Sequence, residues 1–522
     1  MTDTPQANPT PEFEWTRRHV VALIVLCLAA LLDTLDVTVV NVAMPAIRNS
    51  LGFSEGGLAW MVNAYMVPFG GFLLLAGRVG DMLGRRRVLL AGTGVFTVAS
   101  AASGLAPNAT VMVITRAAEG LAAAFVVPMT LALLASLFPA GSARNRAFGV
   151  WGGISATAGT LGLIFGGLLV SSIGWRWIFF VNVPVGVLVM ILATRALPPD
   201  VSHGRQHGFD AIGALTVTAG ASLLAYAIVR DAWHTPATVA SFAGAAVLLG
   251  YFVIHELLVA SDPLLPMSLW RNPSVTGANV IGVLFSSAIF AMFYSTTLYM
   301  QQVLHYSALR TGLAYIPLGL AILITAGISP QVVRALGVRL TSVLGAVIAV
   351  AGLVLFTRVP AGGHLVTDVI VPETVVGLGG GLVLIPTSIA AMSGVPATRS
   401  GVASALLNAS RQLGGALGLA TISTIVTNRT AAFITSGVSV PVAMTDGFHA
   451  GFAASAGLVA ASVLAAAALL REDGRGDRVN LVELQAAGAL SRLPVAPRGR
   501  RHGFRLEDVD VARGPVDLAI AL

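Results

Sequence analysis

Long apolar segments that recur along the chain constrain its fold more than any other feature. Between Val20 and Leu470 lie fourteen blocks of about 20 apolar residues, each long enough to cross a core of about 30 Å as a helix. They lie near residues 20–45, 56–76, 88–106, 110–137, 146–172, 177–196, 210–229, 236–258, 274–300, 311–332, 339–357, 366–390, 401–426 and 448–470. The chain is therefore predicted to be an all-α polytopic membrane protein with fourteen transmembrane helices.

The basic residues predict the orientation of these spans. All 31 are arginines, and if the N-terminus is cytoplasmic, the loops on its side carry fourteen of them against six on the other. The positive-inside rule then places both termini in the cytoplasm, in the cell membrane of a bacterium. The net charge of +7 reports topology in such a chain, so we expect a bilayer and no nucleic acid as partner. Cys27 is the single cysteine and the nine histidines are scattered, so we expect no metal site.

An internal repeat divides the spans into two sets of six. Related segments recur 252 to 257 residues apart, and they pair Gly57-Leu-Ala-Trp60 with Gly312-Leu-Ala-Tyr315, Gly120-Leu with Gly377-Leu, and Gly149-Val with Gly401-Val. Two six-helix bundles in the same orientation, separated by an inserted pair, are one of the known transporter architectures.

This repeat predicts the organisation of the chain. The segments are an N-terminal cytoplasmic segment (1–19), a first bundle (20–196), a cytoplasmic linker (197–209), the inserted pair (210–258), a cytoplasmic connector (259–273), a second bundle (274–470) and a cytoplasmic tail (471–522). Substrate sites in such proteins lie near the membrane midplane, between the two bundles.

Two carboxylates, Asp33 and Asp36, stand inside the first apolar run. An ionised side chain in hydrocarbon costs from about 3 to more than 10 kcal/mol, so such an acid needs a partner, a water-filled cavity or a retained proton. A rise of 1.5 Å per residue places Asp36 about 15 Å below the outer surface, with Arg116 and Glu119 of the fourth span about 10 and 15 Å deep. Asp33 and Asp36, like Arg116 and Glu119, are three residues apart and share a helix face.

These depths lead to two interpretations of the four residues. In the functional one, Arg116 favours ionisation of a carboxylate among Asp33, Asp36 and Glu119, and protonation of one acid alternates with substrate binding. In the other, Arg116 and Glu119 form a static buried ion pair, and Asp36 only hydrogen-bonds across helices.

A basic loop between the second and third spans reads Gly77-Arg-Val-Gly-Asp81-Met-Leu-Gly84-Arg85-Arg86-Arg87. Its glycines permit a tight turn against a neighbouring helix, and Asp81 can pair with a basic group or a helix N-terminus. The arginines hold the inner face. A purely topogenic loop would explain the arginines but not the spacing of the glycines and the aspartate.

This loop resembles the signature loop of the major facilitator superfamily. Three further segments resemble motifs of its fourteen-helix drug:proton antiporter branch, namely Leu35-Asp36-x-Thr38-x-x-Asn41-x-Ala43-x-Pro45, Arg116-x-x-x-Gly120, and Trp175-Arg176-Trp177 continuing to Asn182 and Pro184. The likeness covers about residues 15–470. It implies the major facilitator fold, with two six-helix bundles plus two inserted helices, and alternating access driven by a proton gradient without a cofactor.

The chain departs from the branch pattern at two places. In the fifth span Leu163 stands where the pattern has proline, although the close-packing Gly162, Gly166 and Gly167 remain. In the fourth span Glu119 replaces the usual glutamine, which adds a titratable group.

Four further residues are candidates for the substrate pathway. Asn41 belongs to the first-span motif. Arg411, about 17 Å deep in the thirteenth span, either meets an anionic substrate or an acid of the other bundle, or braces the packing. Glu373, about 10 Å from the outer side, either meets a cationic substrate or rims the outer vestibule. Tyr294 belongs to a set of aromatic residues that either line an amphipathic pocket or form interfacial belts.

These features predict a proton-coupled multidrug exporter, and hence an antibiotic-resistance protein, that works as a monomer on amphipathic or cationic small molecules. The first alternative is a dedicated exporter or flippase for one amphipathic metabolite or lipid. A polytopic enzyme or receptor is disfavoured, because the loops carry no clustered catalytic side chains and leave no room for a signalling domain.

Overall fold

The computed structural model describes residues 15–139, 142–200, 210–229, 235–260, 263, 267–395 and 400–470, and over these ranges every regular element is helical. This agrees with the need of a chain in lipid to satisfy its backbone hydrogen bonds internally. Within the same ranges nine helices are long and apolar enough to span a membrane, and one of them, Ala308–Phe356, covers two predicted spans. The predicted cytoplasmic tail, residues 471–522, lies outside the described residues.

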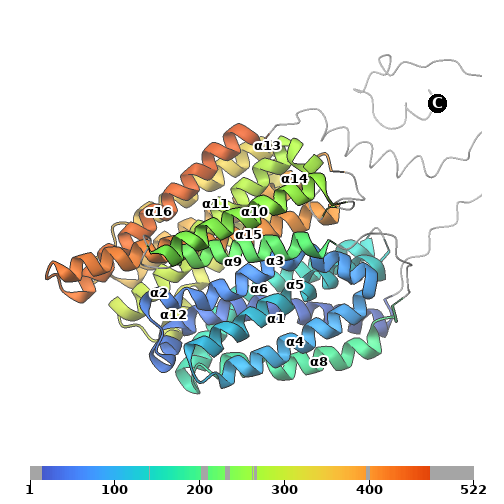
Figure 1. The fold of residues 1–522 in the computed structure, drawn as a ribbon, viewed down its shortest axis with the longest axis horizontal. Helices are drawn as coiled ribbons and strands as arrows, with labels where there is room; N and C mark the ends of the chain where they lie inside the picture. Colours follow the sequence, from blue (N-terminus) through green and yellow to red (C-terminus); the bar gives the residue numbers. More distant parts are fainter. Residues whose placement is uncertain are drawn as a thin grey trace, which may run out of the picture. The chain divides into compact units, whose positions relative to one another are not determined.

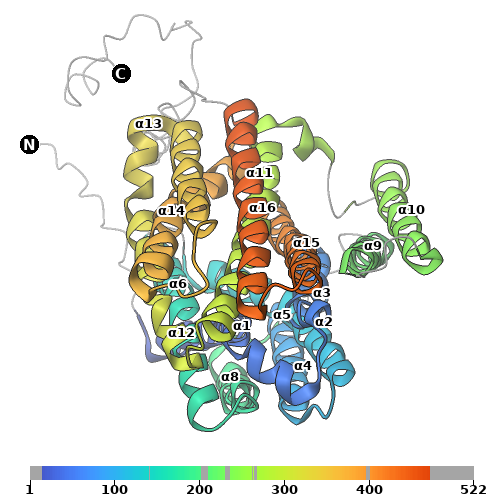
Figure 2. The same cartoon turned by 90° about the vertical axis from the view of Figure 1, so that its left-hand side faces the viewer.

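The two halves of the chain form the two groups of helices visible in Figures 1 and 2. The first half contains α1 (Arg17–Leu51), α2 (Glu55–Leu58), α3 (Trp60–Leu83), α4 (Arg85–Leu105), α5 (Ala109–Leu137), α6 (Ser142–Ser172), α7 (Trp177–Phe180) and α8 (Asn182–Ala196). The inserted pair is α9 (Ala211–Val229) and α10 (Pro236–Leu258). The second half contains η1 (Met267–Arg271), α11 (Pro273–Leu298), η2 (Tyr299–Val303), α12 (Ala308–Ala314), α13 (Ile316–Phe356), η3 (Leu365–Ile370), α14 (Val371–Met392), α15 (Ser400–Thr435) and α16 (Val440–Leu469).

The long helix α13 accounts for two predicted spans, because the chain reverses inside it. Gly337 has φ 82° and ψ 166°, which breaks the helix. Before this break α13 runs parallel to α14, because its contacts with α14 advance in the same direction along both helices. After the break Gly345 contacts Leu382 and Gly352 contacts Val376, so the two helices run antiparallel. Each predicted span therefore falls on a helical segment, an arrangement compatible with fourteen spans.

Glycine contacts repeat between the two halves. A methyl group on Gly120 of α5 would lie 2.1 Å from the Tyr65 carbonyl oxygen of α3, and one on Gly377 of α14 would lie 2.6 Å from that of Leu318 on α13. Glycine here lets two helix backbones touch, as small residues do in membrane bundles. The same pairing recurs between α6 and α1 and between α15 and α11, at the contacts of Gly162 with Thr38, Gly166 with Val39, Gly414 with Val283, and Gly418 with Ser287.

Several contacts between described residues of the two halves lie in the middle of the helices and toward one end. We call the end that carries α2 and α12 the α12 end, and the end that carries Trp15 and Leu470 the terminal end. Near the α12 end Gln301 Nε2 donates to the Val42 carbonyl at 2.9 Å, and a methyl group on Gly167 of α6 would lie 2.6 Å from the Ala308 carbonyl of α12. Near the middle, Gly70 of α3 lies against Leu413 of α15.

The inserted pair lies beside both halves (Figure 2). Helix α9 packs on α3 and on α15. On the α3 side a methyl group at Gly71 would lie 2.2 Å from Thr218 Oγ1, and on the α15 side Thr424 Oγ1 donates to the Ile228 carbonyl at 3.3 Å. The predicted division of the chain into segments stays a prediction, although α9 and α10 lie within its range 210–258.

Candidate functional site

Arg116 of α5 is the centre of a buried charge cluster in the first half. Its guanidinium forms ion pairs with Asp36 of α1 and with Glu119 one turn further along α5. The three side chains are 0–1% exposed. Charges removed from water in this way are costly unless they are paired, and Arg116 is paired with two acids.

Neutral groups complete the shell around this ion pair. Arg116 Nε donates to the Met61 carbonyl of α3 at 3.3 Å. Asn182 Nδ2, at the start of α8, donates to Asp36 Oδ1 and to Ser100 Oγ of α4, both at 3.1 Å. The cluster thus joins α1, α3, α4, α5 and α8, five of the helices of the first half.

Tyr65 connects the fourth candidate, Asp33, to this cluster. Its hydroxyl donates to Asp33 Oδ1 at 2.5 Å, and its ring lies 4.5 Å from the Arg116 guanidinium carbon. Such a stacked guanidinium gains cation–π attraction in addition to its ion pairs. Asp33, Asp36, Arg116 and Glu119, which the sequence placed at similar depths, are therefore brought together.

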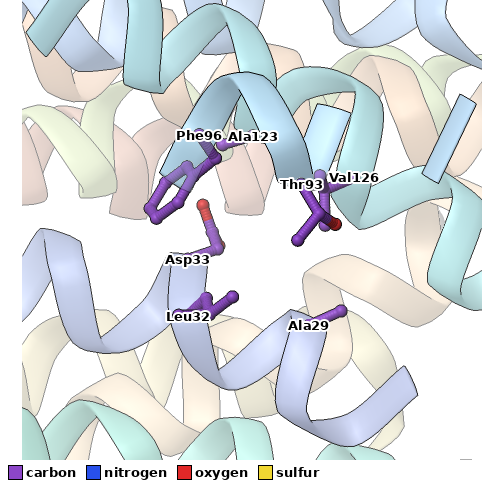
Figure 3. A pocket seen from close by; sticks show the side chains of 7 residues that line it. All are labelled: Ala29, Leu32, Asp33, Thr93, Phe96, Ala123 and Val126. Carbon is purple, nitrogen blue, oxygen red and sulfur yellow. The ribbon is translucent and has the colours of Figure 1, made fainter. Parts of the chain in front are cut away.

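The Asp33 carboxyl also faces a small recess between α1, α4 and α5, drawn in Figure 3. The recess is lined by Ala29, Leu32, Asp33, Thr93, Phe96, Ala123 and Val126, and it is large enough for about one water molecule. One cation thus stands among three carboxyls, and like charges this close in a low dielectric cannot all be ionised. The cluster is chemically suited to holding at least one proton.

Replacing Tyr65 with Phe removes only the hydroxyl and retains the ring over Arg116, so the variant tests the hydrogen bond to Asp33 alone. We expect the variant to fold and to lose about 1 kcal/mol from the lost hydrogen bond, with transport reduced about tenfold as Asp33 is released from the cluster. Initial transport rates in vesicles, together with thermal unfolding of the purified protein, measure both effects. Transport at the wild-type rate would show that the link between Tyr65 and Asp33 is not used.

The candidate signature loop lies at the terminal end, between α3 and α4. Gly84 has φ 99°, and a methyl group there would lie 2.3 Å from Asp200 Cγ. The Asp200 carboxylate accepts hydrogen bonds from the Arg86 and Arg87 amides at 2.8 and 3.0 Å, which caps the first turn of α4. Glycine is needed at this position because the conformation is left-handed and the acid lies against it.

The arginines of this loop hold neighbouring helices of the first half. Arg85 Nη1 donates to the Ala132 carbonyl of α5 at 3.2 Å, and Arg86 Nη2 to the Thr194 carbonyl of α8 at 2.6 Å. At Gly77 no described atom lies within 4 Å of an added methyl group, so the expected close approach is not made there. The Asp81 side chain lies outside the described part of the structure.

Two substrate-pathway candidates of the second half, Glu373 and Arg411, differ in their burial and hydrogen bonding. Glu373 of α14 is 0% exposed, and among the described residues neither carboxyl oxygen has a hydrogen-bond partner. Glu373 is thus enclosed by protein in the described state, and its role at a vestibule rim or in contact with a cationic substrate stays a prediction. Arg411 of α15 is partly exposed, and its Nη2 reaches the Leu384 carbonyl, Thr387 Oγ1 and Ser388 Oγ of α14 at 3.0–3.2 Å.

The remaining two candidates are enclosed by protein. Asn41 is 5% exposed, and its amide donates to the Val37 carbonyl of its own helix at 3.1 Å. Tyr294 is 3% exposed and belongs to the apolar core shared by the halves, which is inconsistent with a place in an interfacial belt.

A second buried polar cluster lies where the inserted pair begins. Asp210 precedes α9, and its Oδ1 accepts from the Gly213 amide at 2.8 Å and pairs with His255 Nε2 of α10 at 2.9 Å. Burial alone would raise the pKa of Asp210. Hydrogen bonds from Gly213, Glu256 and His255 outweigh burial and hold this pKa below its ordinary value of 3.8.

The lowered pKa of Asp210 makes the stability of the inserted pair depend on pH. A carboxyl with a depressed folded-state pKa stabilises the fold above its ordinary value, and this contribution is lost as the pH falls through the folded-state pKa. We expect Asp210→Asn to lower the unfolding temperature by a few degrees at pH 7, with the difference from wild type shrinking toward pH 3. An equal difference at both pH values, measured by thermal unfolding in detergent, would contradict this account.

Comparison with known proteins identifies the family of this arrangement. A family model described as "Major Facilitator Superfamily" matches residues 26–419. The chain belongs to the major facilitator superfamily. The expected fold is thereby confirmed, and so is the expectation of a transporter rather than an enzyme.

Individual members of the superfamily show the same relationship. The chain is 34% identical to the "Puromycin resistance protein pur8" of Streptomyces alboniger, over 94% of this chain and 96% of that relative. It is also 34% identical to the "Cephamycin export protein CmcT" of Amycolatopsis lactamdurans, over 81% and 88% of the two chains. Among solved major facilitator structures, a bacterial homolog of the lysosomal transporter Spinster in an inward-facing conformation aligns with a TM-score of 0.62 at 16% identity, over 88% of this chain and 99% of that one. At this identity the likeness concerns the fold alone.

Several residues of the cluster were not singled out by the sequence. Asn182 stands in the sixth-span motif but had no role assigned, and Tyr65 belongs to the same aromatic set as Tyr294. The depth argument applied to the second span would place Tyr65 about 13 Å below the surface, close to the level of Asp36. Asp200 carries no local signal, because its partners on α4 are more than a hundred residues away.

Proposed function

We propose that this major facilitator protein exports antibiotic or drug-like small molecules across the cytoplasmic membrane in exchange for protons. The relatives named for puromycin resistance and cephamycin export support the substrate class. The observation that carries proton coupling is the cluster of one guanidinium and three carboxyls buried in the first half. Buried groups of this kind in membrane helices usually mark ion or proton pathways.

In this proposal Asp36 and Glu119 compete for Arg116, and a proton on one of them releases the guanidinium to the other. Asp33 exchanges protons with the cluster through Tyr65, since that hydroxyl is bonded to Asp33 and lies against Arg116. Asn182 of α8 donates a hydrogen bond to Asp36, so a change in the charge of Asp36 affects a second helix.

We take the described state as the one closed at the α12 end, because the contacts of Gln301 and Gly167 join the halves there. With both termini in the cytoplasm, that end faces outward, and substrate and protons exchange with the cytoplasm in this state. Outward opening then breaks these contacts and rotates one half against the other about the site. Because both halves belong to one chain, a monomer suffices and the proton gradient supplies the energy.

Transport in inside-out vesicles tests this function. Acidifying the lumen should drive uptake of puromycin into vesicles that contain the protein, and collapsing the gradient with an ionophore should stop it. Uptake that survives the ionophore would contradict proton coupling. Absence of uptake of puromycin and of other drugs, with the gradient intact, would favour the dedicated exporter of one metabolite, to which the cephamycin relative also points.

A further inference from the structure

Arg411 is a cation in the middle of the membrane-spanning region, and it has no ion-pair partner among the described residues. It lies eleven residues after the first residue of α15, about 17 Å into a core of about 30 Å. The side chains of the next two residues, Gln412 and Leu413, lie against Gly70 of α3, at 3.1 and 3.0 Å from an added methyl group. Arg411 is therefore next to the seam between the halves, at the level where transporters of this architecture bind substrate.

Among the described residues, no acid forms an ion pair with Arg411. In the described part of the chain its hydrogen bonds come from Nη2 and end on a carbonyl and two hydroxyls. Helix α11, which approaches it at Gly282, contains no charged residue, and the acid of α14, Glu373, is eleven residues from Leu384 or about 17 Å along the helix. Arg116, the other arginine at this depth, is by contrast paired with two carboxyls.

The geometry leaves part of the guanidinium available. The three acceptors of α14 fix the Nη2 side, whereas Nε and Nη1 make no hydrogen bond to a described residue, and the side chain is partly exposed. A guanidinium offers five N–H donors in a planar fork that matches a carboxylate in two parallel hydrogen bonds. Its attachment to α14 pre-organises the fork, so little rotamer freedom is lost on binding.

We infer that Arg411 binds the carboxylate of an amphipathic substrate between the two halves. This inference rests on the proposed export function and adds amphipathic organic acids and zwitterions to its substrate class. The matching charge arises from the substrate itself, which explains why the protein supplies the cation but no acid beside it.

A pair of fluorescent probes that differ only in charge tests the inference. Dansyl-leucine carries a carboxylate and dansyl-leucinamide is its neutral amide. In titrations of purified protein in phosphatidylcholine nanodiscs, we expect the wild type to bind the acid at least about tenfold more tightly than the amide. Arg411→Gln should abolish this preference by weakening acid binding alone, and Arg411→Lys should retain part of it, because a lysine keeps the charge without the fork.

Arg429→Gln is the matched control, since Arg429 lies on the same helix but is exposed and paired with Asp446. It should bind both probes as the wild type does. Equal affinities of the wild type for both probes, no binding of the acid, or a parallel loss of both probes in a folded Arg411→Gln protein would overturn the inference. If Arg411→Gln does not fold, the wild-type ratio and Arg411→Lys decide the matter.

Two further measurements separate neighbouring explanations. Loss of the acid preference in nanodiscs that contain phosphatidylglycerol would assign Arg411 to a lipid headgroup and overturn the inference. Gradient-driven transport of puromycin by the wild type is measured independently of probe binding. A failure to transport puromycin and other drugs therefore rejects the proposed drug export, whereas equal probe affinities reject only the carboxylate site.

Discussion

Asp36→Asn is expected to abolish gradient-driven export while leaving the protein folded. The substitution keeps the size of the side chain and its contact with Asn182, but it removes the negative charge paired with Arg116. Arg116 still pairs with Glu119 in this variant, so the charge of the guanidinium remains compensated. If protonation of Asp36 is the step that couples the gradient to transport, we expect the pH-driven rate to fall about 100-fold, which corresponds to about 3 kcal/mol.

The measurement is the initial rate of puromycin uptake into inside-out vesicles, with and without a pH gradient. Exchange of labelled for unlabelled puromycin at equal pH should persist in the variant, because binding and alternation do not require the charge change. Asp446→Asn, in the exposed pair with Arg429, is the matched control and should transport normally. A gradient response of Asp36→Asn equal to that of wild type would leave only the static ion pair as an explanation.

The second large effect is expected from Arg116→Met. Methionine fills much of the space of the arginine stem but leaves Asp36 and Glu119 buried without a cation. Breaking a buried ion pair on one side costs about 3–5 kcal/mol, because the charges that remain are uncompensated. We expect the variant to unfold at a markedly lower temperature or to accumulate poorly in the membrane.

Removing the stranded acids should reverse this loss of stability. The triple variant Arg116→Met, Asp36→Asn and Glu119→Gln is expected to recover most of the wild-type unfolding temperature, since the two acids that paired with Arg116 no longer carry charge. Its gradient-driven transport should stay absent. Arg429→Met, at the exposed pair, should change stability by less than about 1 kcal/mol. If Arg116→Met alone proves as stable as wild type, the buried cluster does not hold the first half together.

The sequence predicted the depth of residues better than their direction. Asp36, Arg116 and Glu119 were expected at similar levels because the rise of a helix is constant, and these three side chains meet. Glu373 was also placed by depth, but the same arithmetic does not show whether a side chain points into its own bundle or toward the pathway. Helices that are apolar on all sides carry little periodic signal for their rotation, so the burial of Glu373 and the contact of Tyr65 with Asp33 were missed.

Contacts between residues distant in sequence were the second feature that the sequence did not predict. The spans and the repeat follow from composition and spacing along the chain, and both correspond to the helices observed. The capping of α4 by Asp200 depends on the return of the chain to the terminal end after α8, which spacing alone does not encode. The two parts of α13 were predicted as separate spans, and the break at Gly337 separates the two corresponding helical segments.

Helix α9 touches α3 of one half and α15 of the other, at Gly71 and at Thr424. A helix is too stiff to stretch, so any rocking of the halves must be absorbed as sliding along one of these two contacts. The glycine contact is a close fit of backbone against side chain, whereas the hydroxyl contact is a single hydrogen bond of 3.3 Å that is readily exchanged. The inserted pair therefore links the two halves through α3 on one side and α15 on the other, and we expect it to limit how far one half can rotate against the other.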